Sequence, residues 1–412
     1  MTSPAAPSVS SSSSPPATGR LLSLDALRGF DMFWILGADD SVYALQAAGQ
    51  GGALAFFAKQ LEHAEWAGFR FYDLIFPLFI FLVGVSIVFS LGQTIEREGA
   101  RAAYPRILRR FVLMFLLALI YSGGVSKSWP DIRLMGVLNR IALCYLVTAL
   151  VFCHVRWKGL AALCAGLLVG YWALMSLVPF PDLRPRTPAG DLVSPTLAAT
   201  NVAQLNWAST NVLRGVFDPG VNLANYIDQK YLPGRKWDHT WDPEGLLSTL
   251  PAIATCLLGV FAGRLLQNKA VADPQKVRWL LGAGIASVAA GWLWHVDFPV
   301  IKKIWTSSYV LVAGGYSAIL LGVFYQVIEV WQRRTWCLPF VWIGCNAITL
   351  YLANNFLDFG RLARRFAGGD VRRFFDAVVA PGCGDVVLSL VALALAFALA
   401  HFLYRRKIFL RL

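Results

Sequence analysis

The chain has 412 residues, of which 57% are hydrophobic and only 15% are charged, and its formal net charge is +13. Soluble proteins are roughly 45–50% apolar and about 25% charged. The apolar residues here form long blocks such as 111–120 and 386–403. The composition therefore excludes disordered, collagen-like and disulfide-scaffold proteins. It indicates a polytopic membrane protein, because each spanning helix needs about 20 mostly apolar residues.

The positive charge does not indicate a nucleic-acid partner. The basic residues lie between the apolar blocks instead of forming one face, and positive residues at the cytoplasmic ends of spans commonly raise the net charge of membrane proteins. Most of the seven cysteines fall inside apolar segments, namely Cys144, Cys153, Cys164, Cys256 and Cys345. This pattern supports neither a disulfide framework nor a zinc site, so we expect packing roles and no metal.

Residues 1–20 are rich in Ser, Ala and Pro and are expected to form a disordered tail. The first apolar stretch carries Asp25, Arg28 and Asp31, unlike the uncharged core of a signal peptide, so we interpret it as a retained helix. Residues 21–412 are then expected to form one all-α membrane domain with about ten spans. The predicted spans are 22–45, 72–92, 107–124, 134–153, 158–179, 245–266, 277–295, 304–329, 337–357 and 385–404.

Basic residues are more frequent in the segments that are inner if the N-terminus is inside, so both termini are predicted to be cytoplasmic. The arginine-rich stretch 361–373 falls on the predicted outer side and runs against this bias. The longest connection, 180–244, is also outer. Its aromatic residues indicate an ordered lid and not a disordered linker; they are Trp207, Phe217, Tyr226, Tyr231, Trp237 and Trp241.

Charged residues inside apolar segments are candidates for function, because burying them in lipid costs free energy. In the first span, Asp25 and Arg28 are spaced for a structural ion pair, with a functional role as the alternative. Asp39 and Asp40 follow at its outer end, where they are either catalytic carboxylates or a solvated pair.

His63 is the strongest candidate for a general base, because it lies between Glu62 and Glu65 in a loop that returns to the membrane beside Asp39 and Asp40. The alternative is a histidine that only satisfies hydrogen bonds. Further along, Asp73 opens a span that Pro77 is expected to kink, which favours either a pocket or a purely structural bend.

Two later groups of charged residues also have both a functional and a structural interpretation. Arg140, inside the fourth span, requires an anion that is either a protein carboxylate or a bound phosphate. Asp242 and Glu244 either belong to the site or cap the following helix.

Seven blocks, in order along the chain, together resemble the transmembrane acyltransferase family of heparan-alpha-glucosaminide N-acetyltransferase, with this chain similar to its bacterial members. The blocks are 23–31, 63–77, 132–140, 241–250, 258–264, 303–309 and the weaker 343–348. The resemblance implies a helical acetyltransferase, often a homodimer, in the bacterial inner membrane. It would take acetyl-CoA from the cytoplasm and acetylate the amine of a glucosamine-type sugar on the other side.

His63 matches the active-site histidine of that family, and the position of a functional asparagine falls at Asp39. We therefore expect His63 to act as the general base, with Asp39 or Asp40 orienting the imidazole or the sugar ammonium. The acceptor-binding residues are expected to be Glu62, Trp66, Asp73, Asp242, Glu244 and Asn346, with Asn346 also conceivable as the oxyanion donor.

On a straight helix the eleven residues from Arg28 to Asp39 span about 16 Å, comparable with the pantetheine arm of CoA. The CoA phosphates are accordingly expected near inner arginines, which suit phosphate because of their planar donor fork. The candidates are Arg28, Arg109, Arg110, Arg140 and Arg264. Direct transfer and a two-step route through acetylated His63 both stay open, and an amino-sugar transporter is the alternative class.

Overall fold

The computed structural model describes residues 21–48, 52–194 and 197–410, so the predicted tail 1–20 lies outside the described residues. Nearly all regular structure is helical, which confirms the all-α prediction. The α-helices are α1 (Leu22–Phe33), α2 (Asp39–Ala48), α3 (Gly52–Leu61), α4 (Ile75–Glu98), α5 (Ala100–Tyr121), α6 (Val137–His154), α7 (Trp157–Leu177), α8 (Leu223–Tyr231), α9 (Thr249–Gln267), α10 (Asp273–Trp294), α11 (Ser307–Tyr325), α12 (Leu338–Cys345), α13 (Ala347–Leu357), α14 (Phe359–Ala367), α15 (Asp370–Val378) and α16 (Cys383–Arg405).

A helix lies in each of the ten predicted spans. Seven described helices are long and apolar enough to cross a membrane, and α12 with α13 form a possible eighth span that bends by 78°. The seven are Phe71–Glu98, Val137–His154, Trp157–Leu177, Thr249–Gln267, Asp273–Trp294, Ser307–Val330 and Cys383–Arg405. The predicted spans 22–45 and 107–124 are helical, but charged residues keep α1–α2 and α5 outside that group.

Two predicted spans are broken where the sequence pattern suggested straight helices. A π-helical segment, Trp34–Ala38, joins α1 to α2, and Gly37 within it has φ of 109°, a conformation that favours glycine. The second break is at Asn346, which has non-helical dihedral angles between α12 and α13. The 16 Å estimate from Arg28 to Asp39 assumed a straight helix, so it does not hold across Gly37.

Close packing of the helices depends on glycines that let two backbones approach, as is common in membrane bundles. A Cβ atom on Gly84 of α4 would lie 1.9 Å from the carbonyl oxygen of Cys256 on α9, and one on Gly259 would lie 1.9 Å from that of Phe81. Gly29 of α1 and Gly344 of α12 make an equivalent close approach. These contacts fix the helices that carry the candidate site.

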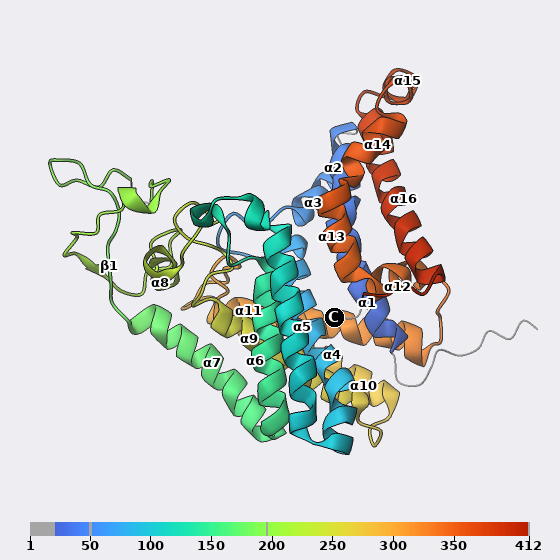
Figure 1. The fold of residues 1–412 in the computed structure, drawn as a ribbon, viewed down its shortest axis with the longest axis horizontal. Coiled ribbons are helices and arrows are strands. Elements are labelled where there is room, and N and C mark those ends of the chain that lie inside the picture. The colour runs from blue at the N-terminus through green and yellow to red at the C-terminus, as the bar shows by residue number, and fades with distance from the viewer. Residues whose placement is uncertain (1–20, 49–51, 195–196, 411–412) are drawn as a thin grey trace, which may run out of the picture.

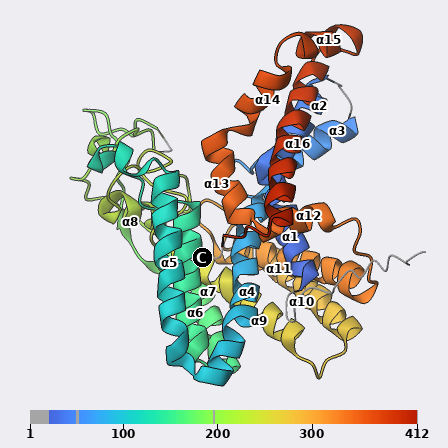
Figure 2. The ribbon, with the colours of Figure 1, turned by 45° about the vertical axis from the view of Figure 1, so that its right-hand side comes forward.

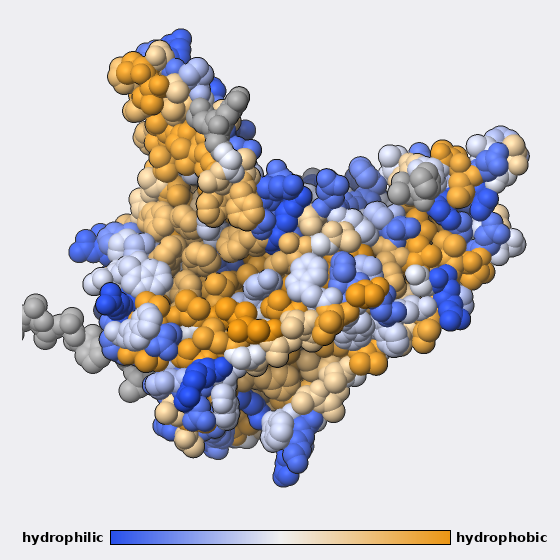
Figure 3. Space-filling model, turned by 180° about the vertical axis from the view of Figure 1, so that it is seen from behind, coloured by the Kyte–Doolittle hydropathy of each residue, from blue (hydrophilic) through white to orange (hydrophobic). Residues whose placement is uncertain are grey.

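The helices form a main body and an arm. In Figure 1, α5 and α6 stand together in the body, while α13–α16 rise away from it beside α2. Figure 2 shows the same separation after a turn of 45°. Seen from behind, apolar side chains cover much of the arm and continue over the body (Figure 3), as expected for surfaces that meet lipid.

The long connection 180–244 is structured on the opposite side of the body from the arm (Figure 1). It contains α8 and two short antiparallel strands, β1 (Phe180–Pro181) and β2 (Val212–Leu213). The loop is fixed to the body near His63, because the indole Nε1 of Trp66 donates a 2.9 Å hydrogen bond to the carbonyl oxygen of Phe217. The ring of Trp66 also packs edge-on against Trp241.

Candidate active site

His63 is held by Asp73, which follows it by ten residues at the start of the second span. The imidazole Nδ1 lies 2.9 Å from the Asp73 carboxylate, whose side chain is 1% exposed, while the His63 side chain is 54% exposed. The same carboxylate accepts hydrogen bonds from the backbone amides of Ala64 (3.1 Å) and Arg70 (3.0 Å). In the tautomer that donates Nδ1–H to Asp73, Nε2 carries the lone pair that can accept a proton.

Lys302 completes this group from a distant part of the chain. Its Nζ lies 3.4 Å from Asp73 Oδ1 and 3.0 and 3.4 Å from the two ring nitrogens of His63. Burial lowers the pKa of Lys302 from its ordinary value, and the negative charge of Asp73 opposes that change. Its loop is docked on the His63 loop by a 2.8 Å hydrogen bond from the Gly68 amide to the Val300 carbonyl.

Asp39 is connected to this group through Tyr72 and is also near enough to His63 to interact with its charge. The Tyr72 hydroxyl donates a hydrogen bond to the Asp39 carboxylate, and the Tyr72 ring lies 5.0 Å from the His63 ring. The direct contact expected between His63 and Asp39 or Asp40 is therefore made by Asp73 instead. Asp39 and Asp40 line a polar groove of about 370 Å³ that also includes Asp358.

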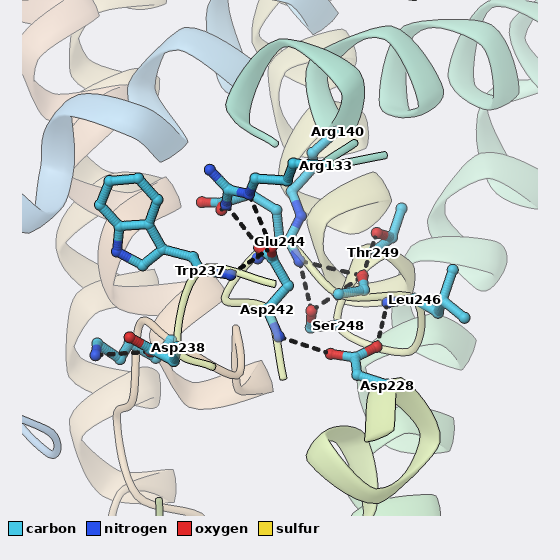
Figure 4. Close-up of polar contacts among 12 residues, drawn as sticks. Arg133, Arg140, Asp228, Trp237, Asp238, Asp242, Glu244, Leu246, Ser248 and Thr249 are labelled. Atoms are coloured by element: carbon cyan, nitrogen blue, oxygen red, sulfur yellow. Dashed lines mark hydrogen bonds and ion pairs between the residues drawn. The ribbon is translucent and has the colours of Figure 1, made fainter. Parts of the chain in front are cut away.

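A second group of charges lies beside the first and is shown in Figure 4. Arg133 binds both oxygens of Asp242 at 2.8 and 2.7 Å and also contacts Glu244 at 2.6 Å. Bidentate pairing of this kind fixes orientation as well as charge. Asp242 and Glu244 thus bind an arginine and do not cap α9, which was the alternative. Glu244 is close enough to Lys302 to attract its ammonium group.

Two carboxylates of this second group titrate unusually. Burial raises the pKa of Asp228 to about 7, despite hydrogen bonds from the amides of Leu246 and Asp242 that favour the charged form. Burial, followed by the neighbouring negative charge of Asp242, also raises the pKa of Glu244 to about 7. Perturbed carboxylates in a shared cluster are typical of functional sites, although structural networks produce them too.

Arg140 is fully buried in the first turn of α6. Its Nη2 donates to the Gly245 carbonyl (3.3 Å) and to the Ser248 hydroxyl, and its guanidinium lies 4.9 Å from the centre of the Trp305 ring. Within the described chain its Nε and Nη1 have no hydrogen-bond partner. By these contacts Arg140 is part of the second group.

Four of the resembling blocks, 63–77, 132–140, 241–250 and 303–309, converge on these two groups of charges. Of the remaining residues predicted to bind the acceptor, Glu62 and Trp66 lie in the His63 loop, and Asn346 lies apart from it. Glu62 binds Arg70 at 2.9 Å, and Trp66 contacts the long loop. Asn346 lies in the break after Gly344, which packs against Asp25 and Gly29 of α1, and its buried amide has no hydrogen-bond partner in the described residues.

The other arginines predicted to bind the CoA phosphates do not form one cluster. Arg28 binds Asp25 at 3.3 Å, as expected for the pair, and also Ser86 on α4 at 2.8 Å. Arg28 is near enough to Arg110 for the two guanidinium groups to repel each other, and Arg110 lies over the Tyr145 ring. Of the other two candidates, Arg109 is exposed on α5, and Arg264 lies over the Phe152 ring.

Sequence reasoning missed Lys302, Tyr72 and Arg133. Lys302 directly precedes the resembling block 303–309, and Arg133 lies within the block 132–140, so those blocks were the available signal. Neither residue stands in an apolar segment, where charge alone draws attention. Tyr72 was not distinguishable from the many other aromatic residues of the chain.

The fold and site thus define a polytopic membrane protein with a histidine–aspartate–lysine group at one end of its bundle. The family model described as heparan-alpha-glucosaminide N-acetyltransferase, catalytic, matches residues 20–209. The chain is 27% identical to the human heparan-alpha-glucosaminide N-acetyltransferase over 96% of its length and 26% identical to the mouse protein over 87%. The chain is therefore similar to this family over most of its length, and it spans 61% and 57% of the length of those two relatives.

Asp228 predicts a pH dependence of folding stability. Its raised pKa means that the folded state holds a proton more tightly than the unfolded state, so wild-type stability falls as pH rises from about 4 to about 7, by at most about 4 kcal/mol. Asp228→Asn removes this titration. Thermal unfolding across that range is expected to show a smaller decline for Asp228→Asn than for wild type. Asp191→Asn, an exposed change in the same loop, serves as the control, and an equal decline in all three proteins contradicts the assignment.

Proposed function

We propose that this protein is a transmembrane N-acetyltransferase that moves an acetyl group from acetyl-CoA to the amine of a glucosamine-type sugar. The observation that carries the proposal is the 2.9 Å contact between His63 and the buried Asp73 in a chain similar to this family. Both similar proteins, from mouse and human, are heparan-alpha-glucosaminide N-acetyltransferases. The bacterial inner membrane, the cytoplasmic termini and the homodimer stay predictions.

His63 acts as the general base in this proposal. Asp73 accepts a hydrogen bond from Nδ1–H and orients the ring, so that Nε2 removes a proton from the attacking amine. The amine nitrogen forms a bond to the carbonyl carbon of the thioester, the carbon–sulfur bond breaks, and CoA leaves as a thiolate that takes up a proton. The exposed edge of His63 lets an acceptor approach from water, while buried Asp73 keeps the ring in place.

Lys302 supplies the positive charge that the reaction requires. Negative charge develops on the carbonyl oxygen when the amine attacks, and a fixed cation beside that position lowers the barrier. Lys302 Nζ is 3.4 Å from His63 Nε2, adjacent to the place where the amine and the thioester would meet. Asp73 and Glu244 attract the ammonium group and favour its charged form.

The donor would lie on the side of Arg28 and Arg110, whose guanidinium groups suit the phosphates of CoA. The guanidinium groups of Arg28 and Arg110 repel each other, which favours a bound anion, and Asp25 neutralises only Arg28 of the two. Arg109 and Arg264 are secondary candidates for binding the CoA phosphates. Arg140 is assigned to the second group of charges because of its contacts. The acceptor would approach from the opposite side, among His63, Trp66, Asp39, Asp40 and the Asp242–Glu244 segment.

Removing the base tests the proposal. In detergent-purified protein given acetyl-CoA and a panel of amino sugars, mass spectrometry is expected to find N-acetylated product. His63→Ala should lower kcat at least about 100-fold, the usual contribution of a general base. His154→Ala, on the far end of α6, should leave kcat unchanged. Movement of sugar without any acetylation would instead indicate a transporter, and radiolabel retained on wild type without acceptor would favour the two-step route.

The pH dependence of kcat tests the role of Lys302. Because burial lowers the pKa of its ammonium group, activity should fall on the alkaline side at a pH below the ordinary lysine value. Lys302→Arg keeps the charge at all accessible pH values and should move that decline upward, whereas Lys302→Met should lower kcat throughout. A profile that is identical in wild type and Lys302→Arg would exclude the proposed role.

A further inference from the structure

The segment 358–382, here called the connecting segment, joins α13 to the spanning helix α16 at the end of the arm. It contains α14 and α15, each nine residues long. Nine residues of helix extend only about 14 Å, which is too short to cross a bilayer. With α12 and α13 taken together as the eighth span, the chain leaves the membrane through α13 and returns through α16, which places the connecting segment at one membrane surface.

Apolar side chains of the connecting segment are exposed instead of being packed inside the protein. On α14, Phe359 and Ala363 are buried against the rest of the arm, but Phe366 is 71% exposed. On α15, Phe374 and Val378 are 58% and 65% exposed. The exposed apolar patch comprises Phe366, Val371, Phe374, Val378 and Val379. Figure 3 shows apolar and polar residues side by side at the end of the arm.

Positive charge accompanies this patch. Arg372 is paired with Asp385 at 2.9 Å, Arg373 is paired with Asp370, and Arg361 is 3.9 Å from Asp358. None of the ion pairs in the described chain includes Arg364 or Arg365, which precede Phe366 on α14. The segment therefore offers two exposed arginines without an ion pair in the described chain next to exposed aromatic and aliphatic side chains, and Arg364 also borders the groove of Asp39, Asp40 and Asp358.

We propose that the connecting segment is an interfacial element that docks on the lipid surface. The exposed apolar patch inserts among the acyl chains, and Arg364 and Arg365 bind the phosphate groups of anionic lipids. Short amphipathic helices with basic and aromatic residues are suited to this boundary, and each arginine near an anionic surface contributes about 1 kcal/mol. Lipid is favoured as the occupant because both ends of the segment are tied to membrane helices and because its charge complements anionic headgroups.

Photo-crosslinking tests the docking. Full-length protein carrying benzoylphenylalanine at position 374 is reconstituted into phosphatidylcholine vesicles with phosphatidylglycerol and irradiated, and its mass is then measured. A lipid adduct is expected at Phe374 and not at Val193, a matched position that is 56% exposed in the long loop. A crosslink between two copies of the chain, or no adduct at Phe374, would overturn the proposal.

The role of the arginines is tested in the same vesicles. The double change Arg364→Gln and Arg365→Gln is expected to reduce the lipid-adduct yield severalfold with phosphatidylglycerol present, but to change it little in phosphatidylcholine alone. Arg364→Lys with Arg365→Lys should restore the yield, which separates charge from folding. A yield that is insensitive to phosphatidylglycerol in every variant would show that these arginines bind no anionic lipid. The readout is independent of acetyltransferase activity.

Discussion

The buried carboxylate of Asp73 organises the candidate site. It contacts His63 and Lys302 and accepts two backbone hydrogen bonds, so a single 1%-exposed side chain fixes the returning loop, the imidazole and a residue from the far end of the chain. A buried carboxylate without such partners would be costly. Asp73 also fixes the start of the second span to α11, because the Tyr309 hydroxyl donates a 2.8 Å hydrogen bond to the backbone carbonyl of Asp73.

The second group of charges stabilises the surroundings of the first. Arg133 ties the Asp242–Glu244 segment to the start of α6, and Arg140 ties the following turn to the same helix (Figure 4). Trp305 links Arg140 to the loop that carries Lys302. Breaking a buried ion pair by removing one partner leaves an uncompensated charge and costs several kcal/mol, about 3–5 in typical cases. The two groups should therefore respond together to mutation.

Much of the fold was predictable from the sequence, because a long apolar block has few alternatives to a membrane helix. The breaks at Gly37 and Asn346 were not, since neither residue interrupts the apolar pattern enough to mark a bend. His63 was selected from the carboxylates near it in the sequence, and its partner was predicted to be Asp39 or Asp40. Asp73 is the partner of His63 in the structure, because the loop between the two residues folds back and brings them together. Lys302, 239 positions from His63, required the tertiary structure.

The proposed transfer from one aqueous compartment to the other connects the predicted donor site near Arg28 and Arg110 with His63. The most direct test uses sealed proteoliposomes with the protein in one known orientation, acetyl-CoA inside or outside, and a membrane-impermeant amino sugar on the opposite face. Acetylated sugar should appear when donor and acceptor are separated by the bilayer, with acetyl-CoA on the Arg28 face and sugar on the His63 face. Product formed only when both substrates share one face would contradict transfer through the protein.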